Sequence, residues 1–302
     1  MTTLTDRYPT RLTEPAPHLP RHDPVVWGDP SGGPLGPYEA VNYADRGHHH
    51  TPHPLFRPHE VDAFRQEAAR LAADPALRAD ERTVVEETAQ EVRSVFEVHR
   101  ISPLFARLTA DPRLADVARQ LLGSEVYVHQ SRVNYKPGFT GGPFYWHSDF
   151  ETWHAEDGMP RPRALSVSVA LTENFPYNGS LMVIPGSHRT FVPCVGRTPP
   201  GHHRTSLRTH APTVGMPDED AVRALAGQAG GIDQFTGEPG GATFFDANCM
   251  HGSNGNITPY PRANVFIVYN SVDNTLREPY AAPEPRPPHI AARDFTPVGE
   301  VR

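Results

Sequence analysis

The hydrophobic pattern of this 302-residue chain changes period at Gly123, and that change limits the folds open to it. Beyond this point the segments that read as strands are EVYVHQSRVNY, ALSVSVAL, LMVIPG, ATFFD and NVFIVYNS. Turn signals separate them, namely KPG, NGS, EPGG, NGN and TPYP. Because no regular helices intervene between the strands, the pattern indicates a sandwich or barrel and argues against a doubly wound sheet.

Helices are predicted before the strands, over residues 61–122. HEVDAFRQEAARLAAD repeats its apolar residues every three or four positions, and VVEETAQEVRSVFEVH is predicted to be helical as well. SPLFARLTADPRLADVARQLLG follows and ends at Gly123, as a helix with a glycine C-cap would. Ser102 is predicted to be an N-cap, with Pro103 in the first helical position.

Two stretches depart from this pattern. Residues 1–60 are rich in Pro, Gly and His and are predicted to be irregular, packed on or over the domain, with the run HHH at 48–50 in a solvated loop. Residues 191–234 are predicted to form an insert with a short helix in DEDAVRALAGQAGG. Residues 61–302 are then expected to form a single domain, with its β core at 124–275.

Composition narrows the choice of partners. The net charge of -7, without a basic block, argues against nucleic acid. No apolar run approaches the roughly 18 residues of a membrane span, and the first ten residues show no secretory signal. With only Cys194 and Cys249, no disulfide framework is expected, so a cytoplasmic location is predicted. Oligomeric state is left open, a homodimer being one option.

A metal centre is the strongest functional candidate. His147 and Asp149 are two residues apart, so in a strand both side chains would reach one ion. His251, in FFDANCMHGSNGN, is the best candidate for a third ligand. Two histidines and one carboxylate occupy one face of an octahedral ion. This is the arrangement of the non-heme Fe(II) oxygenases, which need the open positions for a keto acid and O2.

Other interpretations of these side chains stay open. A His-x-Asp pair is common, and the chain holds 17 histidines. His154 is expected to point away from the metal, and Glu156 and Asp157 are expected to form a turn. The zinc signature His-Glu-x-x-His, CxxC pairs and the G-x-S-x-G elbow are absent from the sequence, although a Ser-His-Asp triad is not excluded.

Cationic residues near the candidate ligands could bind the keto acid. Lys136 is the only lysine among 28 basic residues, which indicates either chance or a need for a compact ammonium group. Arg262 begins the segment RANVFIVYN, eleven residues after His251. If that segment pairs with the strand before His251, its guanidinium returns to the metal and can grip a carboxylate, and Ser253 can add a hydroxyl.

A family resemblance rests on a longer stretch. The segment VYVHQSRVNYKPGFTGGPFYWHSDFETWHAEDG closely resembles the signature of the ectoine hydroxylases, which belong to the phytanoyl-CoA dioxygenase-like group of Fe(II)/2-oxoglutarate oxygenases. NGSLMVIPGSH, CMHGSNGNITPYPRANVFIVYNS and the PRP around Arg286 are similar too. Gly141 and Gly142 stand where a more polar pair is expected, and the insert differs after Thr205. Both departures are expected to lie away from the ligands.

The resemblance implies a mainly β fold with flanking helices around a double-stranded β-helix, the jelly roll of the cupins. It implies that Fe(II) is held by His147, Asp149 and His251. It further implies that 2-oxoglutarate binds at Lys136 and Arg262, with Ser253 nearby.

The implied activity is hydroxylation of ectoine to 5-hydroxyectoine in compatible-solute biosynthesis, with O2 consumed and succinate and CO2 released. The resemblance also implies that Gln130 is at a position that binds ectoine and that Trp153 is at a position that stabilises the bound ectoine. Alternatively, Gln130 points outward and Trp153 is a rim residue that packs over the core. Arg286 is a further candidate for the substrate carboxylate. Two other functions stay open: oxygenation of another small zwitterion or imino acid, and metal binding by a non-catalytic cupin-like protein.

Overall fold

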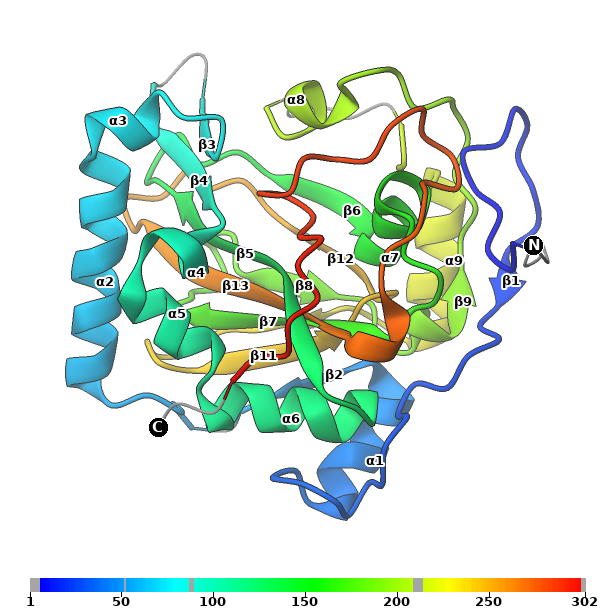
Figure 1. Cartoon of the computed structure of the whole chain (residues 1–302), viewed down its shortest axis with the longest axis horizontal. Helices are drawn as coiled ribbons and strands as arrows, with labels where there is room; N and C mark the ends of the chain where they lie inside the picture. The colour runs from blue at the N-terminus through cyan, green and yellow to red at the C-terminus, as the bar shows by residue number, and fades with distance from the viewer. Residues whose placement is uncertain (1–5, 52, 87–89, 209–213, 300–302) are drawn as a thin grey trace.

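The computed structural model describes residues 6–51, 53–86, 90–208 and 214–299, and within them two antiparallel sheets form a jelly roll (Figure 1). The larger sheet has the order β2-β11-β7-β13-β5-β4-β3 and the smaller the order β10-β8-β12-β6. The larger consists of β2 (His48–His50), β3 (Thr83–Val85), β4 (Val92–Phe96), β5 (Val126–Lys136), β7 (Ala164–Ala170), β11 (Ala242–Asp246) and β13 (Arg262–Ser271). The smaller consists of β6 (Phe144–Ser148), β8 (Leu181–Val183), β10 (Asp233–Gln234) and β12 (Met250–Ser253).

The two long strands β5 and β13 pair through most of their length and form the centre of the larger sheet. Alternation along them separates two environments. On one face, Val133 and Ile267 pack into the main hydrophobic cluster under the helices. On the other face, Lys136 of β5 bonds Ser253 of β12 in the smaller sheet, so this face looks into the space between the sheets. The functional residues of β5 therefore lie inside the jelly roll.

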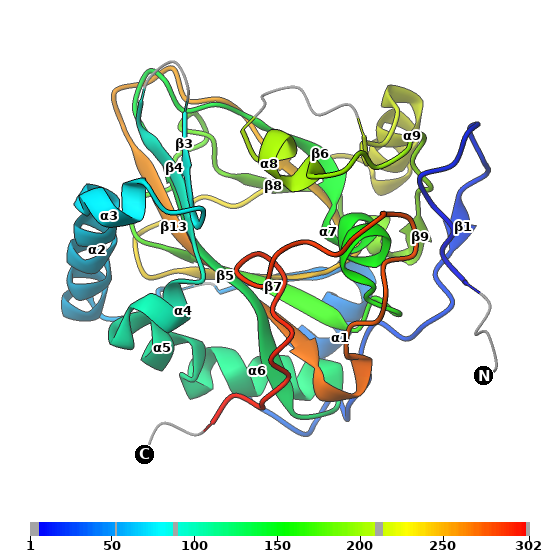
Figure 2. The same ribbon diagram turned by 45° about the horizontal axis from the view of Figure 1, so that its top comes forward.

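Helices cover the outer face of the larger sheet (Figures 1 and 2). They are α2 (Pro58–Ala73), α4 (Val98–Ile101), α5 (Pro103–Thr109) and α6 (Pro112–Leu122). Phe64, Phe105 and Leu121 are buried in the cluster that joins them to the sheet, and each such side chain contributes about 1.5–3 kcal/mol by burial. The predicted caps are confirmed. Ser102 Oγ accepts the Phe105 N–H at 3.4 Å, and Gly123 ends α6 with φ of 62°.

One helical prediction is wrong. The segment VVEETAQEVRSVFEVH was expected to extend the helical region, but its described residues form β3, β4 and the start of α4. The valines in this stretch are β-branched and suit a pleated surface. Ser94 and Val95 of β4 pair with Asn134 and Val133 of β5, so the segment extends the larger sheet at one edge. Pairing of β4 with β5 therefore outweighs the weak helical spacing of the apolar residues in this segment.

Residues 1–60 are also more ordered than predicted, because they contain α1 (Pro37–Arg46), β1 (Leu19–Pro20) and β2. The histidine run is not a solvated loop but is β2 itself, paired with β11. His48 is buried, and its Nε2 lies 2.7 Å from Asp233 Oδ2. Pairing with β11 satisfies the backbone hydrogen-bonding groups of β2, and Asp233 provides a hydrogen-bond partner for the His48 ring. Residues 1–5 lie outside the described part of this segment.

The insert contains β9 (Thr190–Phe191), which pairs with β1, and α8 (His202–Ser206). Its predicted helix is confirmed as α9 (Glu219–Ala229), capped by Asp218 Oδ1, which accepts the Ala221 N–H at 2.7 Å. Residues 209–213 of the insert lie outside the described residues. A short α3 (Pro75–Arg78) completes the outer helices. Among the described residues, no helix has the length and apolar character needed to cross a membrane.

Candidate active site

Three metal-ligand side chains converge between the sheets. β6 and β12 pair so that His147 and His251 are direct partners, and their ring centroids lie 4.2 Å apart. Asp149 follows the end of β6, with carboxylate oxygens 3.6 Å from His147 Nε2 and 3.8 Å from His251 Nε2. The three donor atoms lie within 4.8 Å of one another, and no other group of this kind occurs among the described residues. The predicted triad is thus brought together.

The surroundings of each donor suit a divalent ion. His147 Nδ1 lies 2.7 Å from the Tyr145 carbonyl and His251 Nδ1 lies 3.0 Å from the Cys249 carbonyl. A carbonyl only accepts, so Nδ1 carries the proton in both rings and Nε2 presents its lone pair. Burial lowers the pKa of His251 to about 4, which keeps this imidazole neutral. Burial alone would raise the pKa of Asp149, but the neighbouring His251 and His147 lower it. The Nε2 atoms of two imidazoles and one carboxylate are thus presented close together.

Two details of the geometry differ from the prediction. His147 and Asp149 were expected on one strand, but β6 ends at Ser148 and Asp149 opens the short helix α7 (Asp149–Thr152). The turn from strand to helix, and not strand alternation, therefore directs the Asp149 carboxylate toward the two histidine rings. The strand pairing on which the return of Arg262 to the metal was conditional does not form, because β13 lies between β5 and β7. Arg262 is instead the direct partner of Lys136 on β5.

Lys136 and Arg262 form a buried pair of cations. Both residues are under 5% exposed, and Lys136 Nζ donates to Ser253 Oγ at 2.8 Å and to the Asn254 carbonyl. In the described part of the chain, neither cation forms an ion pair with a carboxylate. Burial lowers the pKa of Lys136 to about 6, and the charge of Arg262 acts in the same direction. Burial also lowers the pKa of Arg262 to about 10. An anionic ligand would favour the charged form of both side chains, so this pair of basic groups suits such a ligand.

Two glycines make room for the lysine. Gly179 has φ of 79°, and a Cβ added there would come 2.6 Å from Lys136 Cδ. A Cβ on Gly141 would come 2.3 Å from Lys136 Cγ. The expectation that Gly141 lies away from the ligand residues is therefore wrong. The tight packing supports the interpretation that this position needs a slim side chain with a compact ammonium group.

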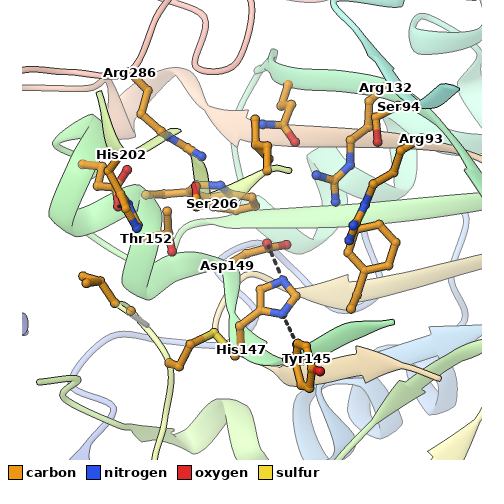
Figure 3. Close-up of a pocket in the computed structure, with 18 of the residues that line it drawn as sticks. Arg93, Ser94, Arg132, Tyr145, His147, Asp149, Thr152, His202, Ser206 and Arg286 are labelled. Atoms are coloured by element: carbon orange, nitrogen blue, oxygen red, sulfur yellow. Dashed lines mark hydrogen bonds and ion pairs between the residues drawn. The ribbon is translucent and has the colours of Figure 1, made fainter. Parts of the chain in front are cut away.

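A cavity of about 150 Å³ opens onto His147 and Asp149 (Figure 3). Its size suits a small molecule. One wall comes from β4 and β5 and the opposite wall from residues 149–157, while residues of the insert and Arg286 complete the lining. The two predicted substrate residues, Gln130 and Trp153, both line it. Lys136, Arg262 and Ser253 do not line the cavity, although Phe144 does, and the Phe144 ring centroid lies 5.2 Å from Lys136 Nζ.

The structure bears on the two alternatives, an outward-pointing Gln130 and a rim position for Trp153. Gln130 does not point outward, because it is buried and its Nε2 donates to the Ile290 carbonyl at 2.7 Å, inside the cavity wall. Trp153 is 2% exposed and belongs to a hydrophobic cluster, yet it also presents a face to the cavity. The edge of His129 packs against it, with ring centroids 5.1 Å apart. It is a wall residue and not a rim residue.

Arg132 is a cavity residue that sequence reasoning missed. It lies on β5 between Gln130 and Lys136, and in Figure 3 it points into the cavity from the wall opposite Arg286. Its Nε is buried without a hydrogen-bond partner, and no described carboxylate pairs with its guanidinium. Burial lowers its pKa. The period of two along β5, from Gln130 through Arg132 to Lys136, was the signal that could have identified it.

The opposite wall is a π-helix, Trp153–Asp157, that continues α7. The prediction of a turn at Glu156 and Asp157 is wrong, because both are buried helical residues held by cations. Asp157 accepts Arg286 Nε at 2.7 Å and Nη2 at 2.6 Å, so that guanidinium is engaged. His154 points away from the metal group, as expected, and its Nε2 lies 2.9 Å from Asp6 Oδ1. π-Helical turns are frequent at functional sites.

A jelly roll that holds two histidines and one carboxylate beside a small cavity defines a non-heme metal oxygenase. The model of the phytanoyl-CoA dioxygenase (PhyH) family matches residues 46–264. The chain therefore belongs to the phytanoyl-CoA dioxygenase family.

Relatives of known name place the chain, within this family, among the ectoine dioxygenases. The ectoine dioxygenase of Nocardia farcinica is 57% identical over 293 residues, 97% of this chain and 95% of that protein. The ectoine dioxygenase of Streptomyces coelicolor is 55% identical over 300 residues, 98% of each. The crystal structure of EctD from S. alaskensis with 2-oxoglutarate and 5-hydroxyectoine is similar with a TM-score of 0.88 and 48% identity, covering 99% of this chain and 98% of that one.

Proposed function

We propose that this protein hydroxylates ectoine to 5-hydroxyectoine, with Fe(II) as cofactor and 2-oxoglutarate and O2 as co-substrates, releasing succinate and CO2. The reaction belongs to compatible-solute biosynthesis. The observation that carries the proposal is the group His147, Asp149 and His251 at a small cavity, together with the buried basic pair Lys136 and Arg262, which has no acidic partner among the described residues. Ectoine dioxygenases that match nearly the whole chain support the choice of substrate.

His147, Asp149 and His251 would hold Fe(II) through two neutral Nε2 atoms and one carboxylate oxygen. The donor set fits because all three atoms already lie within 4.8 Å of one another. When bound, the iron supplies the oxidising chemistry that hydroxylates an unactivated carbon with O2 and 2-oxoglutarate. The Tyr145 and Cys249 carbonyls fix the two rings, and Ser166 Oγ donates to Asp149 Oδ2 at 3.2 Å, so the donors are oriented in advance.

Lys136 and Arg262 would bind the distal carboxylate of 2-oxoglutarate, with Ser253 as a further donor. Among the described residues their hydrogen-bond acceptors are neutral, since Lys136 donates to a hydroxyl and a carbonyl and Arg262 donates to the Gly179 carbonyl. A carboxylate offers both cations a stronger partner than these neutral oxygens. Ser253 is two residues from His251 on β12, which connects this anion site to the metal end of the jelly roll.

Ectoine is a small zwitterion, and the cavity offers complementary groups. Arg132 would take its carboxylate, because this guanidinium has no acidic partner among the described residues, whereas Arg286 is engaged by Asp157. The ring of Trp153 would face the cationic ring of ectoine, an interaction worth about 0.5–2 kcal/mol. Gln130 would add a neutral hydrogen bond from the same strand as Arg132. Binding at both ends fixes which carbon faces the metal.

The test is incubation of the purified protein with Fe(II), 2-oxoglutarate and ectoine, followed by mass analysis. The expected product is ectoine with one added oxygen, formed together with succinate. Asp149→Ala is the control. A product that forms without 2-oxoglutarate, or turnover of 2-oxoglutarate with no change in ectoine, would refute the proposal. Because other divalent metals outcompete Fe(II) at such sites, the protein should be loaded with Fe(II) under reducing conditions.

The remaining expectations follow from the same activity. Residues 61–302 would act as one dioxygenase domain, with residues 1–60 packed on it. A cytoplasmic location fits, because 2-oxoglutarate and Fe(II) are supplied there and both cysteines are free and buried. Ectoine is the small-molecule partner, and neither nucleic acid nor a membrane is required.

A further inference from the structure

The N-terminal arm, defined here as residues 6–23, runs beside β9 on the side of the molecule opposite α2 (Figures 1 and 2). One of its arginines is held in an unusual way. Arg11 has φ of 56°, a left-handed conformation that few residues other than glycine adopt, and its side chain is 1% exposed. Strained backbone of this kind persists where surrounding contacts over-determine it.

The guanidinium of Arg11 fastens the helical wall of the cavity. Its Nε donates to Glu151 Oε1 at 2.6 Å and its Nη2 donates to Glu151 Oε2 at 2.9 Å, a two-point ion pair with α7. The same Nη2 lies 3.1 Å from Oε1 of Glu156, in the π-helix. Glu151 directly precedes the cavity residues Thr152 and Trp153, and Glu156 itself lines the cavity. Arg11 therefore binds this wall from behind.

The same side chain also contacts the insert. Arg11 Nη1 donates to Thr198 Oγ1 at 3.3 Å. Gly215, which lines the cavity, packs so closely that an added Cβ would come 2.4 Å from Arg11 Nη2. The backbone nearby is joined as well, since the Leu12 N–H donates to the Cys194 carbonyl at 3.0 Å. One guanidinium thus touches both the helical wall and the insert.

We propose that Arg11 is a positioning residue for the substrate, which clamps the insert residues at 198 and 215 against α7 and the π-helix and so keeps the cavity closed around a small zwitterion. The inference rests on the proposed function for the identity of the substrate. Arg11 does not line the cavity, so it acts through Glu151, Glu156 and Gly215. His202 of the insert reinforces the same contact, because its Nδ1 lies 3.0 Å from Glu156 Oε1.

An arginine is needed for this geometry. A planar fork makes the two bonds to Glu151 and still presents Nη1 to Thr198, whereas a lysine ammonium acts as one point charge. Arg21 provides a matched control in the same arm. Its side chain is 3% exposed and its Nη1 lies 2.8 Å from Asp246 Oδ1, but among the described residues it contacts neither the insert nor a cavity residue.

The experiment compares Arg11→Lys, Arg21→Lys and the milder Thr198→Val, which removes only the bond to the insert. The first readout is limited trypsin cleavage, followed by mass analysis, at the exposed insert residues Arg197, Arg204 and Arg208. The second is the Michaelis constant for ectoine beside that for 2-oxoglutarate. The third is hydroxyectoine formed per succinate released, measured on the full chain loaded with Fe(II).

For Arg11→Lys, insert cleavage should be about tenfold faster or more, because breaking a buried ion pair raises the population of the open insert. The Michaelis constant for ectoine should rise, hydroxyectoine per succinate should fall, and the constant for 2-oxoglutarate should stay within roughly twofold. Thr198→Val should change these quantities in the same direction but less, and Arg21→Lys should leave insert cleavage and the ectoine constant unchanged.

Unchanged insert cleavage in Arg11→Lys would overturn the proposal, and so would equal effects of Arg21→Lys, since the cause would then be general docking of the arm. If Arg11→Lys fails to fold, unchanged cleavage and ectoine constant in Thr198→Val would overturn it. The cleavage readout does not depend on the substrate. Failure of the wild-type protein to hydroxylate ectoine would therefore refute the proposed function without deciding the role of Arg11.

Discussion

The metal group and the substrate cavity are built from the chain in different ways. Both histidines lie on paired neighbouring strands, β6 and β12, and the backbone ladder fixes them opposite each other. The cavity wall instead gathers residues from β5, the π-helix, the insert and the C-terminal segment, and buried ion pairs such as Arg11–Glu151 and Arg286–Asp157 join these pieces. Backbone pairing therefore positions the chemistry, while side-chain ion pairs shape the space around the substrate.

This contrast predicts that changes at the metal end abolish turnover. Asp149→Ala removes the only carboxylate of the donor group, so hydroxylation of ectoine should fall by about 10³-fold or more. The product assay by mass analysis measures this directly, with thermal unfolding as a check that the variant is folded. Turnover near that of the wild type would show that Asp149 is not a ligand.

A change at the anion site should affect one co-substrate selectively. Lys136→Ala removes a charged hydrogen-bond donor from the proposed 2-oxoglutarate site, so the apparent affinity for 2-oxoglutarate should fall by about 10- to 100-fold. The Michaelis constant for ectoine should change much less, because Lys136 does not line the cavity. Steady-state kinetics with each substrate varied in turn make the comparison. A larger effect on ectoine would move Lys136 to the substrate side.

Substitutions in the cavity wall should reduce activity less than those at the metal end or the anion site, and they should change the Michaelis constant for ectoine only. Trp153→Ala removes the aromatic face proposed to contact the ectoine cation, so the Michaelis constant for ectoine should rise by about 2- to 30-fold. For Trp153→Phe, which keeps an aromatic ring, the Michaelis constant for ectoine should lie between the values of the wild type and Trp153→Ala. Iron content, measured by elemental analysis, should match the wild type. Loss of iron would show that this wall also supports the metal group.

The binding of 2-oxoglutarate should depend on pH through the protonation of Lys136. Above pH 6 the ligand-free Lys136 is mostly neutral, since burial and Arg262 lower its pKa to about 6. A bound carboxylate favours the charged form, so binding takes up a proton. Apparent affinity for 2-oxoglutarate should then fall as pH rises above 6, by up to about tenfold per pH unit. Anaerobic titration with saturating Fe(II) measures it, and Lys136→Ala should flatten the slope. Equal slopes in both proteins would contradict this assignment.

The same contrast explains what the sequence could predict. The strands after Gly123, the caps of the outer helices and the three candidate ligands are all encoded in short local patterns. The structure has these strands and caps, and it brings the three candidate ligands together, although Asp149 opens α7 and does not lie on the strand. The placement of Arg262 depended on a strand pairing that does not form, because nothing local specifies that β13 lies between β5 and β7.

The cavity wall was harder to predict. Glu156 and Asp157 resemble a turn in sequence, but in the structure they belong to a buried π-helix. There they form ion pairs with Arg11 and Arg286, each more than a hundred residues away. No local pattern encodes such long-range ion pairs. Arg132 is the exception, since its place follows from the period of two along β5.

The most direct test of the account is a crystal structure of the protein grown anaerobically with Fe(II), with anomalous scattering recorded at the iron edge. We predict one strong peak within bonding distance of His147 Nε2, His251 Nε2 and an oxygen of Asp149, with the remaining positions facing the cavity. A peak that lies elsewhere, or that is bonded to fewer than all three side chains, would contradict the account.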